Sequence, residues 1–319
     1  MALNFLSRRV YKLFSALFFV LSLFWSVNSY ARRTVDDDKV FFVIANVENT
    51  VAHEMAHVII DEFQVPVLGN MELAADQLGL LLFSSLMINV DKFPQGKMEI
   101  MRAIYDEVRL EWGSKKDTDK RDYTSIHPFE PQRFYDIACL VYGSDPVALE
   151  EIREFVGIPY SRSFYCRDEY EVTQQSVSWV ISHLGRKTAY DSAEKKITVV
   201  YEQAESDLSE ELKKWLQTSA IIDSIAQRAE ELFEFPRPIT ISVADCQQPN
   251  SMWLSGKGEV VLCYQLLERY LYLARFRDSA PEDILGQDEW SAFCMHESIA
   301  NHYSGYCNAV VTPDQRLTE

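Results

Sequence analysis

The chain has 319 residues, of which 47% are hydrophobic and 25% charged, proportions that are typical of a globular protein and argue against disorder. Its formal net charge is −17, with 48 acidic and 31 basic side chains. Because attraction to nucleic acid and to anionic lipid depends on clustered Lys and Arg, this balance argues against nucleic acid as a partner.

The first segment has the pattern of a secretory signal peptide. Three basic residues precede an apolar stretch at 13–27, and Ala31 ends a short run with small residues where a signal peptidase cleaves. We therefore expect residues 1–31 to be removed, which takes the net charge to −20. The alternative, an uncleaved anchor, is disfavoured because the apolar stretch is short and interrupted by serines. We expect an exported protein, periplasmic or secreted, with no stable membrane insertion after cleavage.

The first half of the remaining chain is predicted to be helical. Apolar residues recur at helical spacing over 41–63, Pro66 and Gly69 interrupt the pattern, and a second helical stretch covers 71–88. These two helices should form an antiparallel hairpin. Further helical patterns follow at 97–112, 131–142, 146–155 and 169–184, with a charged loop at 115–122.

The second half has a different pattern, with β-type runs at 197–201 and 239–243, an amphipathic helix at 208–233 between them, and a hairpin over 252–264. Helices then dominate to the end. The polar stretch 185–196 is the expected linker between a helical region at 32–184 and an α+β region at 197–319 that packs on it. The predicted fold class is mostly helical α+β, with a helix hairpin in the first half and a small sheet in the second.

A five-residue motif in the first helix carries the chemistry. His53-Glu54-Met55-Ala56-His57 places two histidines four residues apart, so both project from one helix face and can hold one metal ion. Imidazole suits zinc in a tetrahedral site, and with a third protein ligand one position stays open for water. Glu54 could accept the proton of that water and return it to the leaving group. A chance match is the alternative, but burying these groups among apolar neighbours is costly unless something binds them.

Two carboxylates one turn apart, Glu72 and Asp76, open the second helix, and either could reach back to the first. Their Glu-x-x-Ala-Asp arrangement resembles that of the gluzincin metallopeptidases. The resemblance implies that Glu72 is the third zinc ligand and that Asp76 braces a ligating histidine from behind. For Glu72 alone, the alternative is an acidic residue favoured by the dipole of the helix N-terminus.

A wider resemblance covers most of the mature chain. Its segments are similar to a family of exported bacterial proteins that are described as metallopeptidases and whose substrates are undetermined. The segments are 53–57, 60–62, 66–69, 72–77, His127, 132–135, Cys139, 142–146, Cys246, Asn250 and 262–264. Two departures stand out: Ala56 replaces a glycine that is common before the second histidine, and 250–253 differs where a small residue and an aromatic are usual.

Other polar residues are weaker candidates. His127 and Arg133 could stabilise an oxyanion by donating hydrogen bonds, as could Tyr123 and Tyr135. The ordinary alternatives are an ion pair for the arginine and a satisfied polar contact for the histidine. His296 precedes a glutamate, but Ala300 stands where a second ligating histidine would belong, so His296, His302 and His183 are interpreted as structural.

All six cysteines lie in the part that we expect to be exported, and their even number fits an oxidising compartment. Their grouping along the chain suggests three local disulfides, namely Cys139–Cys166, Cys246–Cys263 and Cys294–Cys307. A thiolate metal site is the alternative, but no C-x-x-C spacing occurs.

The hypothesis from sequence is therefore a zinc-dependent hydrolase, a metallopeptidase that cleaves peptide or protein substrates in the periplasm or outside the cell. The main alternative is a non-catalytic exported envelope protein with a structural zinc site. The two differ in coordination, because a structural site is closed by four protein ligands whereas a catalytic one keeps a water. A third possibility, an acidic binding module without metal, requires the motif to be accidental.

Overall fold

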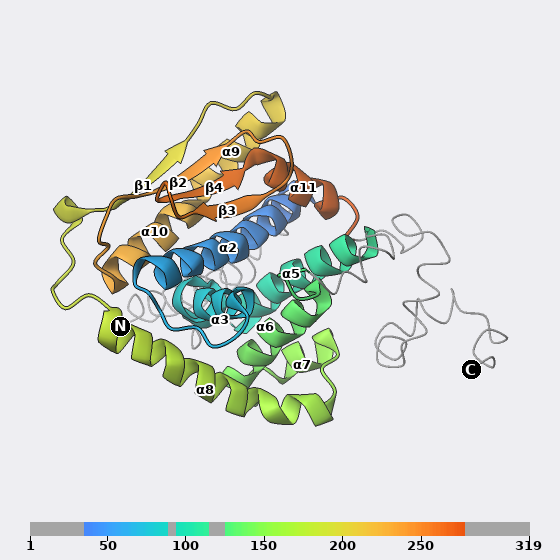
Figure 1. The fold of residues 1–319 in the computed structure, drawn as a ribbon. Coiled ribbons are helices and arrows are strands. Elements are labelled where there is room, and N and C mark those ends of the chain that lie inside the picture. Colours follow the sequence, from blue (N-terminus) through green and yellow to red (C-terminus); the bar gives the residue numbers. More distant parts are fainter. Residues whose placement is uncertain (1–34, 89–93, 115–124, 278–319) are drawn as a thin grey trace, which may run out of the picture. The chain divides into compact units, whose positions relative to one another are not determined.

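The computed structural model describes residues 35–88, 94–114 and 125–277 (Figure 1). Over these ranges the protein is mostly helical α+β, as predicted, with one four-stranded sheet. The expected signal peptide at 1–31, Tyr123, and the segment with Cys294, His296, His302 and Cys307 lie outside the described residues. Among the described residues, no helix combines the length and the apolar character that a bilayer span requires.

The long helix α2 (Val35–Glu62) carries the two motif histidines. The helix predicted over 71–88 is divided at Ser84, whose extended backbone separates α3 (Met71–Phe83) from α4 (Ser85–Ile88). The remaining helices of the first half are α5 (Pro94–Ser114), α6 (Glu130–Ser144), α7 (Glu150–Val156) and α8 (Tyr160–Leu184). Each lies over a predicted helical pattern, although α8 begins well before the expected start at 169.

The sheet has the strand order β1-β2-β4-β3. Its strands are β1 (Ile197–Tyr201), β2 (Ile239–Ala244), β3 (Ser251–Leu254) and β4 (Glu259–Cys263). The pairs β1–β2 and β2–β4 are parallel, whereas β3 and β4 form the predicted antiparallel hairpin. The strand β3 therefore forms one edge of the sheet.

Two helices, α9 (Asp207–Ser219) and α10 (Ile221–Leu232), connect the parallel strands β1 and β2. One helix was expected over 208–233, but Ala220 adopts a left-handed conformation with φ 52° and divides it. The last described helix, α11 (Tyr264–Ala274), follows β4 directly.

Two hydrophobic clusters form the core. The larger one joins α2, α3, α10 and α11 to the sheet, and it includes Val51, Met55 and Ile59 of α2 together with Ile241 and Val260 of the strands. The second packs α4 to α8 together. Figure 1 shows α2 running beneath the sheet, with α3, α5 and α6 on its other side. The apolar face of α2 is thus covered by core, which leaves its polar face, with the histidines, turned toward α3.

Two of the three expected disulfides are present. Cys139–Cys166 joins α6 to α8, and Cys246–Cys263 joins the segment after β2 to the end of β4. The third expected pair lies outside the described residues. Because α6 and α8 belong to the helical half and β4 to the sheet, each half of the protein carries its own covalent link.

Candidate metal centre

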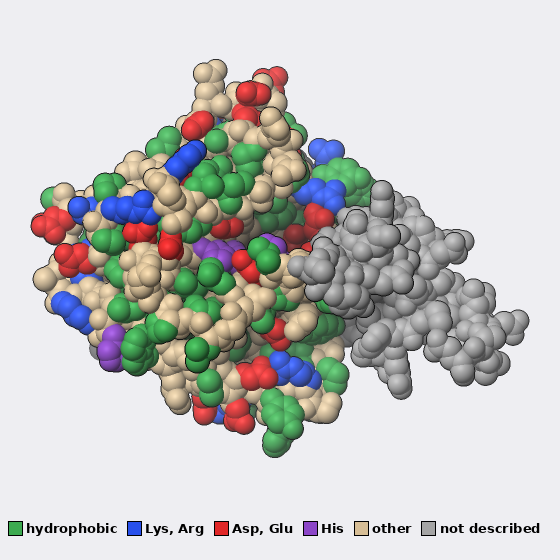
Figure 2. All heavy atoms as spheres, viewed as in Figure 1, with side chains coloured by type: hydrophobic (Ala, Val, Ile, Leu, Met, Phe, Trp, Pro, Cys, Tyr) green, Lys and Arg blue, Asp and Glu red, His purple; other side chains and the backbone are tan. Residues whose placement is uncertain are grey.

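The two motif histidines lie side by side on α2. Their Nε2 atoms are 3.1 Å apart, and their side chains are mostly buried, with 12% and 14% of their surface exposed. In the space-filling view, histidine surface is visible in a hollow at the middle of the face shown (Figure 2). The helical spacing predicted from the motif therefore brings two ligand nitrogens together at a point that solvent can reach.

Helix α3 brings a carboxylate to these nitrogens. Oε2 of Glu72 lies 3.3 Å from Nε2 of His53 and 3.6 Å from Nε2 of His57. The approach is possible because α3 packs directly against α2 at Gly79, where an added Cβ would lie 2.5 Å from the carbonyl oxygen of Ala52. Burial favours the neutral carboxyl, but the adjacent imidazoles outweigh burial and hold the pKa of Glu72 well below its usual range.

The three side chains fit a divalent metal ion. Their ligand atoms form a triangle with edges of 3.1, 3.3 and 3.6 Å. Tetrahedral zinc with ligands at 2.0–2.1 Å requires edges of about 3.3 Å. In addition, Oε2 of Glu72 is buried and makes no hydrogen bond of good geometry in the described part of the chain, although imidazole nitrogens of His53, His57 and His127 lie 3.0 to 3.6 Å from it. A bound cation would satisfy this oxygen, and the donor set of two imidazoles and one carboxylate is one that zinc prefers.

Asp76 lies behind His53, one turn after Glu72 on α3. Its Oδ1 is 2.7 Å from Nδ1 of His53, so the ring can donate its Nδ1–H and direct Nε2 toward Glu72. Burial opposes the protonated imidazole, but contacts with Asp76 and Glu72 outweigh it and raise the pKa of His53 to about 9. Because a histidine must be neutral to ligate a metal ion, metal binding at His53 would release the proton that these carboxylates favour.

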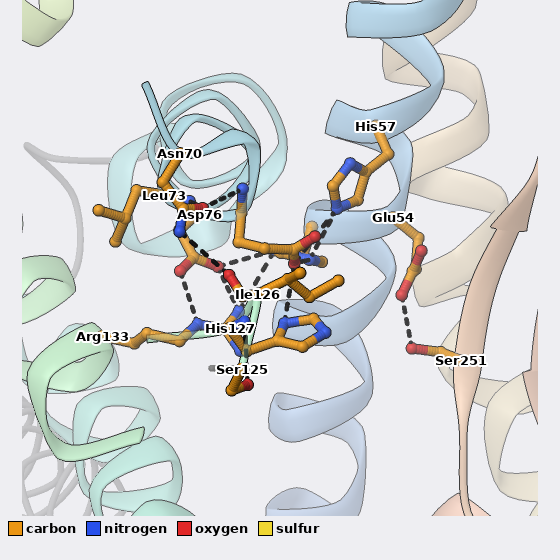
Figure 3. A network of polar contacts seen from close by, with 12 residues as sticks. Glu54, His57, Asn70, Leu73, Asp76, Ser125, Ile126, His127, Arg133 and Ser251 are labelled. Carbon is orange, nitrogen blue, oxygen red and sulfur yellow. Dashed lines mark hydrogen bonds and ion pairs between the residues drawn. The ribbon is translucent and has the colours of Figure 1, made fainter. Parts of the chain in front are cut away.

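Arg133 of α6 clamps Asp76 from the other side. Its Nε and Nη2 donate hydrogen bonds of 2.8 and 2.6 Å to the two carboxylate oxygens of Asp76. Burial favours the neutral carboxyl of Asp76, but Arg133 and His53 outweigh it and lower the pKa of Asp76. The structure thus places Arg133 in a line of contacts that leads through Asp76 to His53 (Figure 3).

Glu54 points away from the histidines toward the sheet (Figure 3). The hydroxyl of Ser251, at the start of β3, donates a 2.7 Å hydrogen bond to Oε1 of Glu54. Two turns further along α2, Nε1 of Trp253 donates to Asp61 across the same interface. The edge strand β3 is therefore held along α2. The Glu54 carboxylate lies between this strand and the candidate metal-ligand group, which consists of His53, His57 and Glu72.

His127 lies in the segment that precedes α6. Its Nδ1 is 3.0 Å from Oε2 of Glu72, and half of its side chain is exposed. It is not part of the group of three whose ligand atoms all lie within 4.8 Å of one another. His127 is thus next to the candidate metal-ligand group, in a half-exposed position.

Other candidates from the sequence lie apart from this network. Tyr135 packs on Phe134, and burial raises the pKa of its phenol. His183 stacks on Trp179 near the end of α8, with ring centroids 4.3 Å apart. Sequence reasoning identified 250–253 as a departure from the family pattern but missed the contact of Ser251 with Glu54, and it missed Asn70, which caps α3. An asparagine directly before an apolar helical pattern is a capping signal that could have identified Asn70.

Comparison with known proteins decides the family. DUF4344, whose description reads "Putative metallopeptidase", matches residues 19–181 and 201–297. The chain belongs to this family. The first matched segment contains the whole metal-ligand group, and the description implies a hydrolase that acts on peptides or proteins with the help of a metal ion. No curated protein and no solved structure matches the chain.

Proposed function

We propose that this protein is a zinc-dependent metallopeptidase that cleaves peptide bonds in the periplasm or outside the cell. One observation carries the proposal: the side chains of His53, His57 and Glu72 offer three ligand atoms at tetrahedral spacing, and the carboxylate of Glu54 lies between this group and strand β3. The family supports peptide hydrolysis, and the donor set supports zinc. The two disulfides support an oxidising compartment.

In this proposal His53, His57 and Glu72 hold the zinc ion. When bound, zinc polarises the scissile carbonyl and makes water acidic enough to attack near neutral pH. Three protein ligands leave a position open, as a catalytic site requires. Asp76 fixes the ring of His53 through Nδ1, and Arg133 fixes Asp76, so we assign Arg133 to this bracing in place of the oxyanion role expected from the sequence.

Glu54 is the proposed general base and acid. Its carboxylate accepts a proton from the attacking water and delivers it to the amide nitrogen that leaves, so the group returns to its starting state. Ser251 holds Oε1 of Glu54 through its hydroxyl, which leaves Oε2 for the proton transfer. His127 is proposed to donate a hydrogen bond to the oxyanion that develops on the scissile carbonyl, since it lies 3.0 Å from Glu72 and is half exposed.

The alternative, a structural zinc site, requires a fourth protein ligand. In the part of the chain that the structure describes, three metal-ligating side chains come together, and His127 lies outside the group. A structural site would also give the carboxylate of Glu54 no chemical task. The arrangement therefore favours catalysis.

The test uses the full mature chain with zinc restored, assayed on a pool of dye-quenched peptides of random sequence. Glu54→Gln should keep one zinc per chain and lose at least about 100-fold in turnover, the contribution of a positioned proton transfer. Ser84→Ala serves as a control, because Ser84 lies at the C-terminal end of α3, away from Glu72. This variant should keep both the zinc ion and the turnover of the native chain. Cleavage by the Glu54 variant at near the native rate would overturn the mechanism, and a native chain without zinc after metal-replete purification would overturn the class.

A further inference from the structure

The side chain of Asn70 makes contacts at both ends of its amide. Asn70 is the N-cap of α3, and its Oδ1 accepts hydrogen bonds from the backbone N–H groups of Glu72 and Leu73, at 2.8 and 3.3 Å. Its Nδ2 donates a 3.0 Å hydrogen bond to the carbonyl oxygen of Ile126, 56 residues away in the chain. Two N–H groups face one atom and a carbonyl faces the other, so the chemistry of the neighbours defines the orientation of the amide.

Each end of the amide leads to a different part of the candidate site. The capped end fixes the first turn of α3, from which the Glu72 side chain extends to His53 and His57. The other end fixes Ile126, the residue directly before His127, and the N–H of His127 is itself held by Ser125 at 3.1 Å. Glu72 and His127 then meet at 3.0 Å, which completes a closed ring of contacts (Figure 3).

The choice of residue is informative, because several side chains can cap a helix. Ser, Thr and Asp cap about as well as Asn, since the cap requires only a short side-chain acceptor. Asn alone among them adds an amide donor opposite its acceptor. Helix capping accounts for Oδ1 of Asn70, whereas the contact with Ile126 requires the Nδ2 donor that only an amide provides.

We propose that Asn70 is a positioning residue that ties the metal-ligating Glu72 and the segment of His127 to one another through the two ends of one amide. It acts on the site without touching metal or substrate. The inference rests on the proposed zinc centre for its effect on metal binding, whereas its effect on the His127 segment can be measured in any case.

Two substitutions separate the two ends. Asn70→Asp keeps an acceptor for the cap of α3 and removes the donor to Ile126, whereas Asn70→Ala removes both. Ser206→Ala is the matched control, because Ser206 caps α9 through one hydrogen bond to the N–H of Ser209, in another part of the chain from the metal-ligand group. Zinc affinity is measured by competition with a chromophoric chelator, and amide hydrogen exchange is followed by mass spectrometry over 125–129.

Asn70→Ala should lose roughly tenfold or more in zinc affinity, the effect of disturbing the support of a ligand. Asn70→Asp should keep at least the native affinity. Both variants should exchange amides over 125–129 at least about threefold faster, as the loss of one ordinary hydrogen bond predicts. Ser206→Ala should change neither property.

Native exchange over 125–129 in Asn70→Asp would overturn the proposal, even if Asn70→Ala failed to fold. Native zinc affinity in a folded Asn70→Ala would overturn it as well. If the native chain itself bound no zinc, the proposed function would fall, while the exchange measurement would still decide the role of Asn70 in holding the His127 segment.

Discussion

Gly79 of α3 packs so closely against Ala52 of α2 that a side chain cannot be added there without moving a helix. A Cβ at Gly79 would lie 2.5 Å from the carbonyl oxygen of Ala52 and 2.8 Å from its carbonyl carbon, and both are backbone atoms that cannot rotate away. Glu72 and Asp76 reach the histidines of α2 from this same helix. Gly79 thus sets how closely α3 approaches α2, and with it the distance between Glu72 and the two histidines.

Gly79→Ala should therefore weaken zinc binding although position 79 touches no ligand. The added methyl pushes α3 away from α2, and displacement of a ligand by even a fraction of an ångström disrupts tetrahedral geometry, so we expect a loss of at least about tenfold in zinc affinity. Gly256→Ala is the control, because no atom lies within 4 Å of the Cβ that it would add. Chelator competition measures both variants. Equal affinity for the two would show that the helix contact does not control the site.

Glu72 and Asp76 should differ in how strongly they affect zinc. Glu72→Ala removes a ligand and should nearly abolish tight binding, whereas Asp76→Ala removes a support and should cost about 10- to 100-fold in affinity. Zinc titration of the two variants provides the comparison. A deeper loss for Asp76→Ala would reverse the assignment of ligand and support.

Glu107 on α5 should make stability depend on pH. Burial, reinforced by the charges of Glu111 and Glu130 and opposed by Arg133 and Arg269, raises the pKa of Glu107 to about 8. An unfolded chain ionises this carboxyl near pH 4.3, so between about pH 5 and 8 the folded chain holds one more proton than the unfolded chain. The free energy of unfolding of the protein should therefore decrease as pH rises through this window, because the folded state holds the extra proton.

Glu107→Gln cannot ionise, and it should remove this slope. Urea unfolding in the presence of a chelator should give equal stabilities for the variant and the native chain near pH 4.5, and a more stable variant near pH 8. Identical pH profiles for the two proteins would show that Glu107 ionises normally in the fold.

The cysteines beyond the described residues should pair with each other. With Cys139–Cys166 and Cys246–Cys263 formed, Cys294 and Cys307 are the remaining two of six. Non-reducing peptide mapping of the exported protein should recover three cross-linked peptide pairs, the third joining Cys294 to Cys307. Free thiols at these two positions would contradict the pairing.

Much of the local structure could be predicted from the sequence, because hydrophobic periodicity and turn residues act over short distances. The helix over 41–63, the interruption by Pro66 and Gly69, and the β3–β4 hairpin all follow from such signals. The helix break at Ala220 could not be predicted, because no glycine or proline marks it and alanine rarely adopts a positive φ.

Contacts of the site between residues that are far apart in the sequence could not be predicted either. The spacing of His53 and His57 predicted their shared face, and family resemblance pointed to Glu72 and Asp76. Nothing in the sequence near Ser251 indicates its contact with Glu54, because that contact depends on which strand forms the edge of the sheet. The pairing of β1 with β2 in parallel is also a tertiary outcome, which the strand patterns alone leave open.

The contacts of the site differ greatly in how far they reach along the chain, and this has a consequence for the order of assembly. Asp76 and His53 are 23 residues apart, whereas Ser251 and Glu54 are 197 apart. Closing a short loop costs less entropy and takes less time than joining distant segments. During folding the helix hairpin can therefore form while the strands are still unfolded, and Glu54 gains its serine partner only when β3 is in place. On the proposed function, a folding chain would thus be able to bind a metal ion before Glu54 had its serine partner.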